Sequence, residues 1–288
     1  MAPFDTYQAR ADEQRASLLA ATASPFAIDV RFLGGLSERQ RAAFTSAADR
    51  WSRIIVGDLP NVVVDNELID DVLILAQGVD IDGAGSVLGQ AGPTHLRPGG
   101  TVPTASLPAK GIMSFDAADL ARMESDGTLD DVIAHEMGHV LGIGTVWSTK
   151  SLLQGAGTSN PTFTGAGAMD EYAALRGREG RRAVPVENTG GPGTAGGHWR
   201  ETVFRNELMS GFIGQPGNPL SRMTAASLGD LGYAVDLDAA EPYALPDLLA
   251  LAEEGALVPH SAPIDDGFVL PVIPQTLPLD SLESPEGP

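Results

Sequence analysis

The stretch DDVIAHEMGHVLGIG, residues 130–144, places two histidines four positions apart. On an α-helix this spacing puts both side chains on one face, so His135 and His139 can present two imidazole nitrogens to one metal ion. Glu136 lies about 100° round the helix from His135, where a carboxylate can take a proton from a water without binding the ion itself. Gly142 follows His139 by three residues, which predicts that the chain leaves the helix there in a left-handed conformation.

The surroundings of the two histidines support a helix. Thr128 and Asp131 have the spacing of a capping box, and apolar residues recur at helical intervals from Leu129 to Leu141. A pair of histidines at this spacing also arises by chance on ordinary helices. A catalytic zinc site needs a third protein ligand and an open coordination position, so the helix alone does not establish one.

The third ligand must come from elsewhere in a chain with five histidines. The commonest pattern would place it at Thr145, which is not a ligand of this kind. His95 and His260 lie in predicted loops, where single histidines are usually only solvated. His198 lies in GGHW, among glycines that let the backbone approach the helix, and Trp199 can pack beside it. A glutamate ligand is the alternative, and the downstream candidates are Glu171, Glu187, Glu201 and Glu207.

Composition restricts the class of protein. A chain of 288 residues with 43% hydrophobic residues can bury a substantial core. Its net charge of −20 repels phosphate backbones, so we expect no nucleic-acid partner. The absence of cysteine excludes disulfides, thiolate zinc ligands and a cysteine nucleophile. No apolar run is long enough to span a bilayer, and the N-terminus lacks the pattern of a secretory signal.

Hydrophobic periodicity predicts an α+β fold. Residues 1–26 are polar and rich in alanine, and we expect a loosely docked helix there. A capping box at Ser37 and Gln40 predicts the start of the first long helix. Strands are predicted at 26–34, 61–65, 71–80, 86–92 and 111–116, and helices at 38–55, 129–141, 168–176, 221–233 and 242–256.

The sequence divides into four regions by composition and motif. The first is an N-terminal extension, and the second ends with the histidine-bearing helix. The third is rich in loops and contains the third candidate ligand, and the fourth is an acidic, Pro-rich tail that we expect to be mobile in part. In order, these regions are residues 1–25, 26–142, 143–240 and 241–288.

The motifs taken together resemble the leishmanolysin-like zinc metallopeptidases of the metzincin clan, in a compact, cysteine-free and bacterial-type form. The matching pieces are HEMGHVLG (135–142), GGHW (196–199) and NELMSG (206–211). The resemblance covers roughly residues 26–236. It implies that Met209 forms a methionine turn beneath a metal bound by three histidines. The ligands would be His135, His139 and His198, and Glu136 would be the catalytic base.

The resemblance also implies an architecture and an activity. The expected fold is a twisted mixed sheet packed on two helices, including the active-site helix, followed by a loop-rich subdomain with the methionine turn and a late helix. The expected activity is zinc-dependent cleavage of proteins or peptides by a secreted or cell-surface monomer. A substrate is expected to lie extended along an edge strand at 111–116, with 184–188 as the opposite wall. The cysteine that holds some family members latent has no counterpart here, because this chain contains no cysteine, so their mode of regulation does not apply to it.

Two further hypotheses remain open from the sequence. The loop DIDGAG, residues 80–85, alternates Asp80 and Asp82 before a glycine, as a calcium loop does, but no distal glutamate follows at the usual spacing. A zinc-binding surface or interaction module without proteolysis is the alternative function. The intact Glu136 argues against that alternative, because its loss alone would abolish catalysis and leave the fold unchanged.

Overall fold

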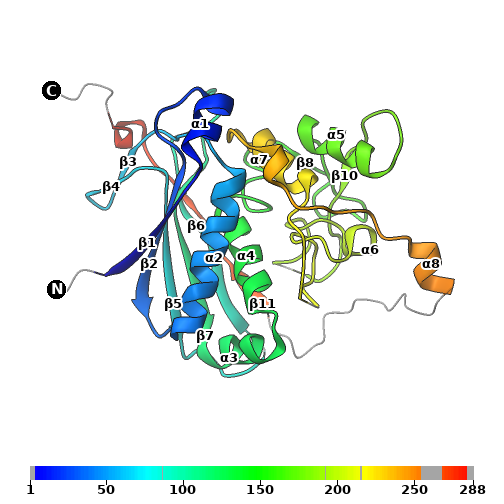
Figure 1. Cartoon of the computed structure of the whole chain (residues 1–288), viewed down its shortest axis with the longest axis horizontal. Coiled ribbons are helices and arrows are strands. Elements are labelled where there is room, and N and C mark those ends of the chain that lie inside the picture. The colour runs from blue at the N-terminus through cyan, green and yellow to red at the C-terminus, as the bar shows by residue number, and fades with distance from the viewer. Residues whose placement is uncertain (1–3, 86, 192, 215, 254–267, 284–288) are drawn as a thin grey trace.

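A mixed seven-stranded sheet dominates the N-terminal part of the molecule, and helices α2 and α4 lie across one of its faces (Figure 1). The computed structural model describes residues 4–85, 87–191, 193–214, 216–253 and 268–283. Across the sheet the strands are β1 (Asp5–Arg10), β2 (Ala27–Gly34), β5 (Val72–Val79), β7 (Pro108–Asp116), β6 (Val87–Leu96) and β11 (Phe268–Pro271), and β12 (Gln275–Thr276) also pairs with β6.

The direction of the strands confirms a mixed sheet. Strands β2, β5 and β7 are parallel neighbours, whereas β1 is antiparallel to β2 and β6 is antiparallel to β7. The prediction that residues 111–116 form an edge strand is wrong, because β7 lies between β5 and β6. The chain reaches β7 directly from β6, so the two strands pair in antiparallel fashion and β6 covers that side of β7.

Helices α2 (Glu38–Ile54) and α4 (Leu129–Val140) form the layer that carries the histidines. The predicted capping box of α2 is present, with both hydrogen bonds between Ser37 and Gln40. Trp51 of α2 is fully buried, and its indole N–H donates to the carbonyl of Ala134 in α4 at 2.8 Å. This bond fixes α4 against α2 one residue before the first histidine of the motif.

The start of α4 differs from the predicted capping box. Thr128 makes no side-chain cap hydrogen bond, because helix α3 (Ala117–Asp126) ends just before it and Gly127 returns the chain directly into a helical conformation at Thr128. The carboxylate of Asp131 is used elsewhere. It accepts the backbone N–H of Gly217 at 2.6 Å, so it ties the first turn of α4 to the second part of the chain.

Two further segments depart from the sequence-based expectation. Residues 5–10, expected within a helix, form strand β1 at the edge of the sheet, and only α1 (Glu13–Ala20) is helical in that region. Residues 61–65, expected in the sheet, form β3 (Val62–Val64), which pairs with β4 (Glu67–Ile69) in a separate hairpin. Tyr7 of β1 donates to Asp49 of α2 at 2.7 Å, which anchors the first strand over the helix layer.

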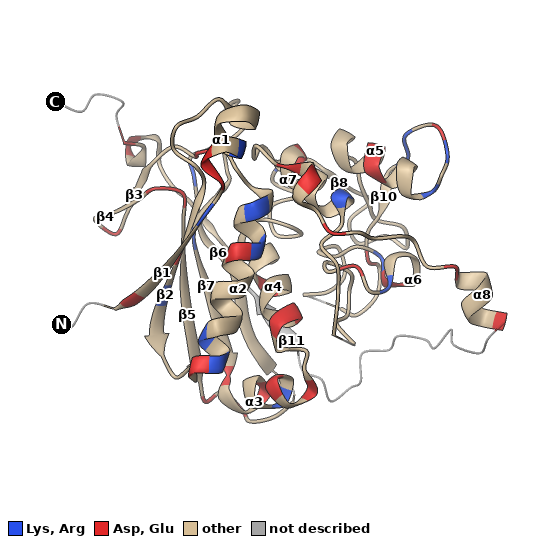
Figure 2. Cartoon of the chain, viewed as in Figure 1, with Lys and Arg blue, Asp and Glu red and all other residues tan. Residues whose placement is uncertain are grey.

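The second part of the chain lies beside this helix layer and is rich in loops (Figure 1). Helices α5 and α7 pack together there. In Figure 2, basic and acidic residues lie towards both ends of α2, and Arg39 in its first turn forms an ion pair with Asp130 of α4. Within the described residues, no helix is long and apolar enough to span a membrane. The elements of this part are β8 (Leu153–Gln154), β9 (Thr162–Phe163), α5 (Ala166–Leu175), β10 (Val184–Pro185), α6 (Glu201–Phe204), α7 (Arg222–Leu231), η1 (Leu237–Ala239) and α8 (Leu248–Glu253), and η2 (Leu279–Ser281) follows β12.

The close contact between α4 and the sheet gives a testable prediction. A Cβ atom at Gly111 of β7 would lie 2.3 Å from Cγ1 of Val140. We therefore expect Gly111→Ala to lower the free energy of unfolding by about 1–3 kcal/mol, the usual cost of overpacking. Gly214→Ala is the control, since a Cβ there meets no atom within 4 Å. Urea unfolding checks the difference, and adding Val140→Ala should recover part of the loss; equal stability of the two single variants would contradict the packing argument.

Candidate metal centre

Helix α4 buries the histidine pair and its glutamate together. His135, Glu136 and His139 are 5%, 7% and 8% exposed. The helix is apolar around them, so these three polar side chains lie at the interface between the helix layer and the second part of the chain. Polar groups that are this deeply buried require partners, because leaving them unpaired costs free energy.

A close approach of two backbones brings the third histidine to the helix. After α4 the chain turns through Gly142 at φ +110°, the left-handed conformation predicted from the sequence. Gly144 also has a positive φ, and a Cβ there would lie 2.1 Å from the carbonyl oxygen of Gly197. Only glycine fits this contact. It places the segment that leaves α4 directly against the residue that precedes His198.

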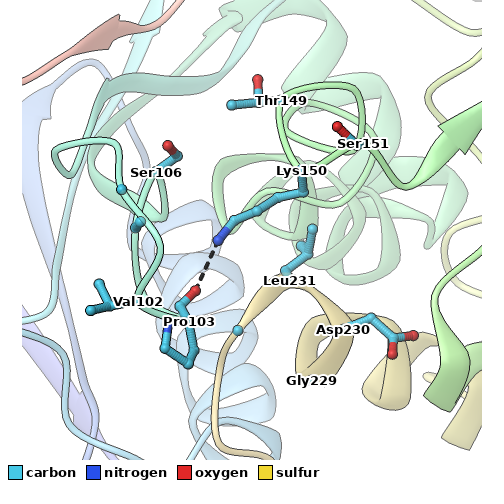
Figure 3. A pocket seen from close by; sticks show the side chains of 12 residues that line it. Val102, Pro103, Ser106, Thr149, Lys150, Ser151, Gly229, Asp230 and Leu231 are labelled. Atoms are coloured by element: carbon cyan, nitrogen blue, oxygen red, sulfur yellow. Dashed lines mark hydrogen bonds between the residues drawn. The ribbon is translucent and has the colours of Figure 1, made fainter.

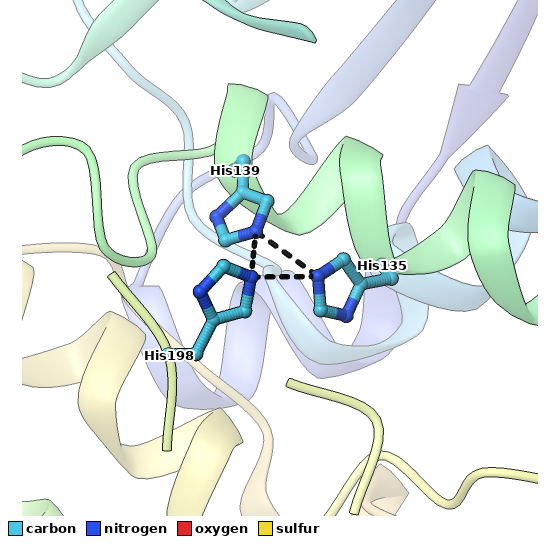
Figure 4. A group of neighbouring side chains, drawn as sticks. All are labelled: His135, His139 and His198. Atoms are coloured by element: carbon cyan, nitrogen blue, oxygen red, sulfur yellow. Dashed lines mark hydrogen bonds between the residues drawn. The ribbon is translucent and has the colours of Figure 1, made fainter. Parts of the chain in front are cut away.

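The three imidazole rings converge on one point (Figure 4). The Nε2 atoms of His135 and His198 are 3.0 Å apart, those of His135 and His139 are 3.1 Å apart, and those of His139 and His198 are 2.9 Å apart. Nitrogen ligands at about 2.0–2.1 Å from a tetrahedral zinc ion lie about 3.3 Å from one another. The observed triangle is therefore close to the spacing that a shared ion requires.

The second nitrogen of each ring decides what the triangle can bind. Each Nδ1 lies within hydrogen-bonding distance of a backbone carbonyl, and a carbonyl oxygen can only accept. Each Nδ1 must therefore carry the proton, which leaves all three Nε2 atoms as bare lone pairs that face one another. Three acceptors cannot bond to each other, whereas a cation among them satisfies all three. The Nδ1 partners are Leu208 for His135 at 2.6 Å, Ile143 for His139 at 2.8 Å and Thr194 for His198 at 2.9 Å.

The protonation states of the three histidines are those that cation binding requires. Burial, and then the neighbouring rings, lower the pKa of His135, His139 and His198 to about 3. The rings are therefore neutral near pH 7, as metal ligands must be. Burial raises the pKa of Glu136 to about 8 in the metal-free protein. A cation beside this carboxyl group would act in the opposite direction and favour the carboxylate.

The comparison with known proteins agrees with this geometry. Residues 100–247, slightly more than half of the 288, match the leishmanolysin peptidase family. The chain belongs to the leishmanolysin family. It is also similar to a leishmanolysin homolog of Crithidia fasciculata, with 26% identity over 133 residues. That alignment covers 44% of this chain and 20% of the relative, so the chain spans about a fifth of the length of the curated relative that it matches.

The leishmanolysin match contains all the residues that converge at the centre. Members of this family are zinc-dependent metallopeptidases, and the match extends from residue 100, within the β6–β7 connection, past α7. It leaves out strands β1, β2, β5 and β6 of the sheet, the β3–β4 hairpin and the C-terminal strands β11 and β12. The resemblance inferred from the motifs is thus confirmed at the level of the family.

Met209 lies directly against the histidine-bearing helix. A Cβ atom at Gly138 would lie 2.7 Å from the Sδ atom of Met209 and 2.9 Å from Trp51. Gly138 stands between the two histidines in sequence, so its missing side chain lets the sulfur approach the helix backbone there. The carbonyl of Met209 accepts the backbone N–H of Trp199 at 2.9 Å. Met209 thereby connects the helix to the residue that follows His198.

A buried carboxylate holds this turn in place, and the sequence did not indicate it. Glu207 is fully buried, and it accepts the N–H of Met209 at 2.6 Å and the hydroxyl of Ser221 at 2.6 Å. It also accepts the hydroxyl of Thr224, whose oxygen in turn accepts the indole N–H of Trp199 at 2.8 Å. The chain of bonds links the turn at Met209 to the start of α7 and to the neighbour of the third histidine.

The alternative third ligands lie elsewhere. The carboxylate of Glu187 accepts the backbone N–H groups of Asn188, Thr189 and Glu201. Glu171 pairs with Arg222, and the oxygens of Glu207 are engaged as described above. His95 lies on β6 outside the triangle, Glu201 is likewise outside it, and His260 is outside the described residues.

The predicted calcium loop is held by protein groups. The carboxylate of Asp116 accepts the backbone N–H groups of Ile81, Asp82 and Gly83 at 2.6, 3.1 and 3.2 Å. In the described part of the chain, neither Asp80 nor Asp82 belongs to a group of three side chains close enough to share an ion. Calcium at this loop remains a prediction. The acidic group with suitable spacing is Asp58, Asp70 and Asp71, and Asp71 there accepts the N–H groups of Ala27 and Leu59.

A polar hollow of about 390 Å³ lies apart from the histidines (Figure 3). Its lining comes from three segments: Gly100, Val102, Pro103, Ala105 and Ser106 from the first, residues 149–151 from the second and residues 229–232 from the third. The ammonium group of Lys150 crosses it and donates to the carbonyl of Pro103 at 2.9 Å. None of the candidate site residues lines this hollow, namely His135, Glu136, His139, Gly142, His198 and Met209.

Acidification should destabilise the metal-free protein through the three rings. Their pKa is about 3 in the folded chain and 6.5 when unfolded, so between these values the unfolded chain binds more protons. Stability from this source is present above pH 6.5 and is lost as the pH falls towards 3. We expect the free energy of unfolding to fall by the order of 1–2 kcal/mol per ring between pH 7.5 and pH 5.

Urea unfolding of chelator-treated protein at the two pH values measures this loss. The control is the chain with His135→Gln, His139→Gln and His198→Gln, which has no such rings to protonate. A fall in stability that is as large in the control as in the unchanged chain would show that other groups carry the pH dependence.

Proposed function

We propose that this chain is a zinc-dependent endopeptidase. The single observation that supports this most is the triangle of Nε2 atoms with all three Nδ1 protons tied to carbonyls, beside a buried glutamate on the same helix. Membership of the leishmanolysin family supports the same reaction class. We place the protein outside the cell or at its surface, as a monomer, in line with its acidity and its family.

The three histidines would hold the ion, and the carbonyls of Leu208, Ile143 and Thr194 keep each ring oriented with Nε2 inward. Zinc bound there would supply positive charge that polarises the scissile carbonyl and acidifies the attacking water. Glu136 takes the proton of that water on its carboxylate and passes it to the nitrogen of the leaving amine. Met209, fixed by Glu207, keeps the underside of the centre apolar and rigid.

The substrate would bind as an extended chain beside α4. Because β7 pairs with long strands on both sides, we assign the peptide-pairing role to its neighbour β6, whose outer side carries only the short strands β11 and β12. The opposite wall in our proposal is residues 184–188, whose Glu187 N–H donates to the carbonyl of His198 at 2.8 Å. This bond places the wall next to the third ligand.

Substitution of the base separates catalysis from metal binding. We expect Glu136→Ala to keep about one zinc ion per chain and to lose at least 10²-fold in kcat/KM on a generic peptide, because the general base is gone. Zinc content by elemental analysis and hydrolysis of a fluorogenic peptide check this pair of outcomes. Full activity in Glu136→Ala would exclude this mechanism.

Substitution of the third ligand tests the centre itself. We expect His198→Ala to lose most of its zinc, and with it the activity. His95→Ala is the matched control, since this histidine lies on β6 outside the triangle and should leave the zinc content unchanged. Equal zinc content in both variants would assign the ion to other residues.

A further inference from the structure

The C-terminal segment, residues 268–283, returns to the sheet and pairs with β6 (Figure 1). Strand β11 runs parallel to β6 opposite residues 87–91, and β12 pairs with His95 and Leu96. The backbone N–H of Leu277 donates to the carbonyl of Leu96 at 2.9 Å. The segment therefore covers both ends of the only side of β6 that β7 does not already occupy.

The covered edge lies one strand away from the metal-binding helix. Val272 of the segment packs on Gly92 of β6, where an added Cβ would lie 3.2 Å from the Cβ of Val272. Gly92 is next to Gly111 of β7, and Gly111 contacts Val140, the residue after His139. Contacts thus run without a break from the C-terminal segment to the last turn of α4.

We propose that the C-terminal segment is an intramolecular occupant of the peptide-binding edge, and that proteolysis is suppressed until the segment leaves β6. The proposal rests on the proposed function, in which a substrate needs that edge. A sheet edge offers one row of N–H and C=O groups, so it can pair with one extended chain at a time. Substrate and segment therefore compete for the same backbone groups of β6.

The segment has a firm anchor at one end. Leu277 is 8% exposed and belongs to a small apolar cluster beneath the β3–β4 hairpin. Beyond it, the N–H of Glu283 donates to the carbonyl of Asn61 at 3.0 Å, and the amide of Asn61 donates to the carboxylate of Glu283 at 2.7 Å. The other members of the cluster are Val62, Val64, Ile69, Leu73 and Ala109.

The pairing next to the metal centre is weak by comparison. Strands β11 and β12 are four and two residues long, and they are interrupted at Pro274. Pro271 is the last paired residue of β11, opposite Ala91, and Pro278 follows β12; proline has no N–H to donate to a ladder. The segment is therefore held mainly through Leu277, which is a site where release can be engineered without touching the histidines.

The test compares Leu277→Asp with Ile273→Asp in the zinc-loaded full chain. Both variants add one carboxylate to the segment, but Ile273 is 94% exposed and makes no anchor. We expect Leu277→Asp to raise kcat/KM on a fluorogenic peptide at least tenfold and Ile273→Asp to leave it unchanged. Hydrogen exchange of the amides of residues 87–96 should become faster in Leu277→Asp only, which reports release independently of activity.

Adding the segment back as a separate peptide distinguishes its release from a general loss of structure in the variant. A synthetic peptide of residues 268–283, added to Leu277→Asp, should inhibit it and slow the exchange of β6 again. Leu277→Ala, which shortens the anchor without adding charge, should show a smaller rise in activity and is used if Leu277→Asp unfolds. Faster exchange of β6 with unchanged kcat/KM would overturn the proposal.

A binding measurement separates this proposal from the proposed function. In the Glu136→Gln background, a fluorescein-labelled casein peptide should bind at least tenfold more tightly when Leu277→Asp is also present. If hydrogen exchange shows that β6 is released but the peptide binds with equal affinity in the presence and absence of Leu277→Asp, the segment does not compete with substrate, whatever the activity. If no zinc-loaded variant cleaves any peptide, the proposed endopeptidase function is wrong. The binding measurement then still shows whether the C-terminal segment competes for β6.

Discussion

Three ring nitrogens without protons face one another inside the protein, and most of the second part of the chain is arranged to keep them there. Each imidazole is locked in one tautomer by a backbone carbonyl, so the cluster is repulsive without a cation and satisfied with one. This constraint explains the positions of the surrounding carbonyls. The turn that follows α4 supplies one of them through Ile143, the loop before His198 supplies another through Thr194, and the turn at Met209 supplies the third through Leu208.

The apolar and polar supports of the centre are parts of one assembly. Trp51 of the neighbouring helix α2 fixes α4 within the helix layer, and Met209 contacts the same helix at Gly138. Glu207 stabilises the backbone at Met209, and through Thr224 it reaches the indole of Trp199. A buried carboxylate with several donors is costly to disrupt, because each donor then loses its partner. The arrangement of the three histidines thus depends on Trp51, Glu207 and Thr224, which lie outside the triangle of Nε2 atoms.

The sequence predicted the parts of the site that local patterns encode. Helix α4 follows from its apolar periodicity, and His198 stood out through its glycines and Trp199. The partners of the Nδ1 atoms could not be predicted, because backbone carbonyls belong to every residue and carry no signature. Residues 5–10 were expected to be helical, but they form a strand. Their pairing with β2 is a tertiary contact, and it overrides a weak local preference for helix. The internal position of β7 likewise depends on long-range pairing with β6, which periodicity does not report.

The contact between Gly144 and Gly197 has a consequence for how the family can diversify. These glycines close a long excursion of the chain, since the two histidines that it separates are 59 residues apart and their nitrogens are 2.9 Å apart. The entropic cost of closing a loop grows only with the logarithm of its length, by about 0.6 kcal/mol for each doubling. Changes in the length of exposed loops between Gly144 and Gly197 therefore add little closure entropy, provided that the buried residues of the segment and the carbonyl of Thr194 keep their places. Evolution can therefore change the loops of this segment while the triangle of histidines stays constant.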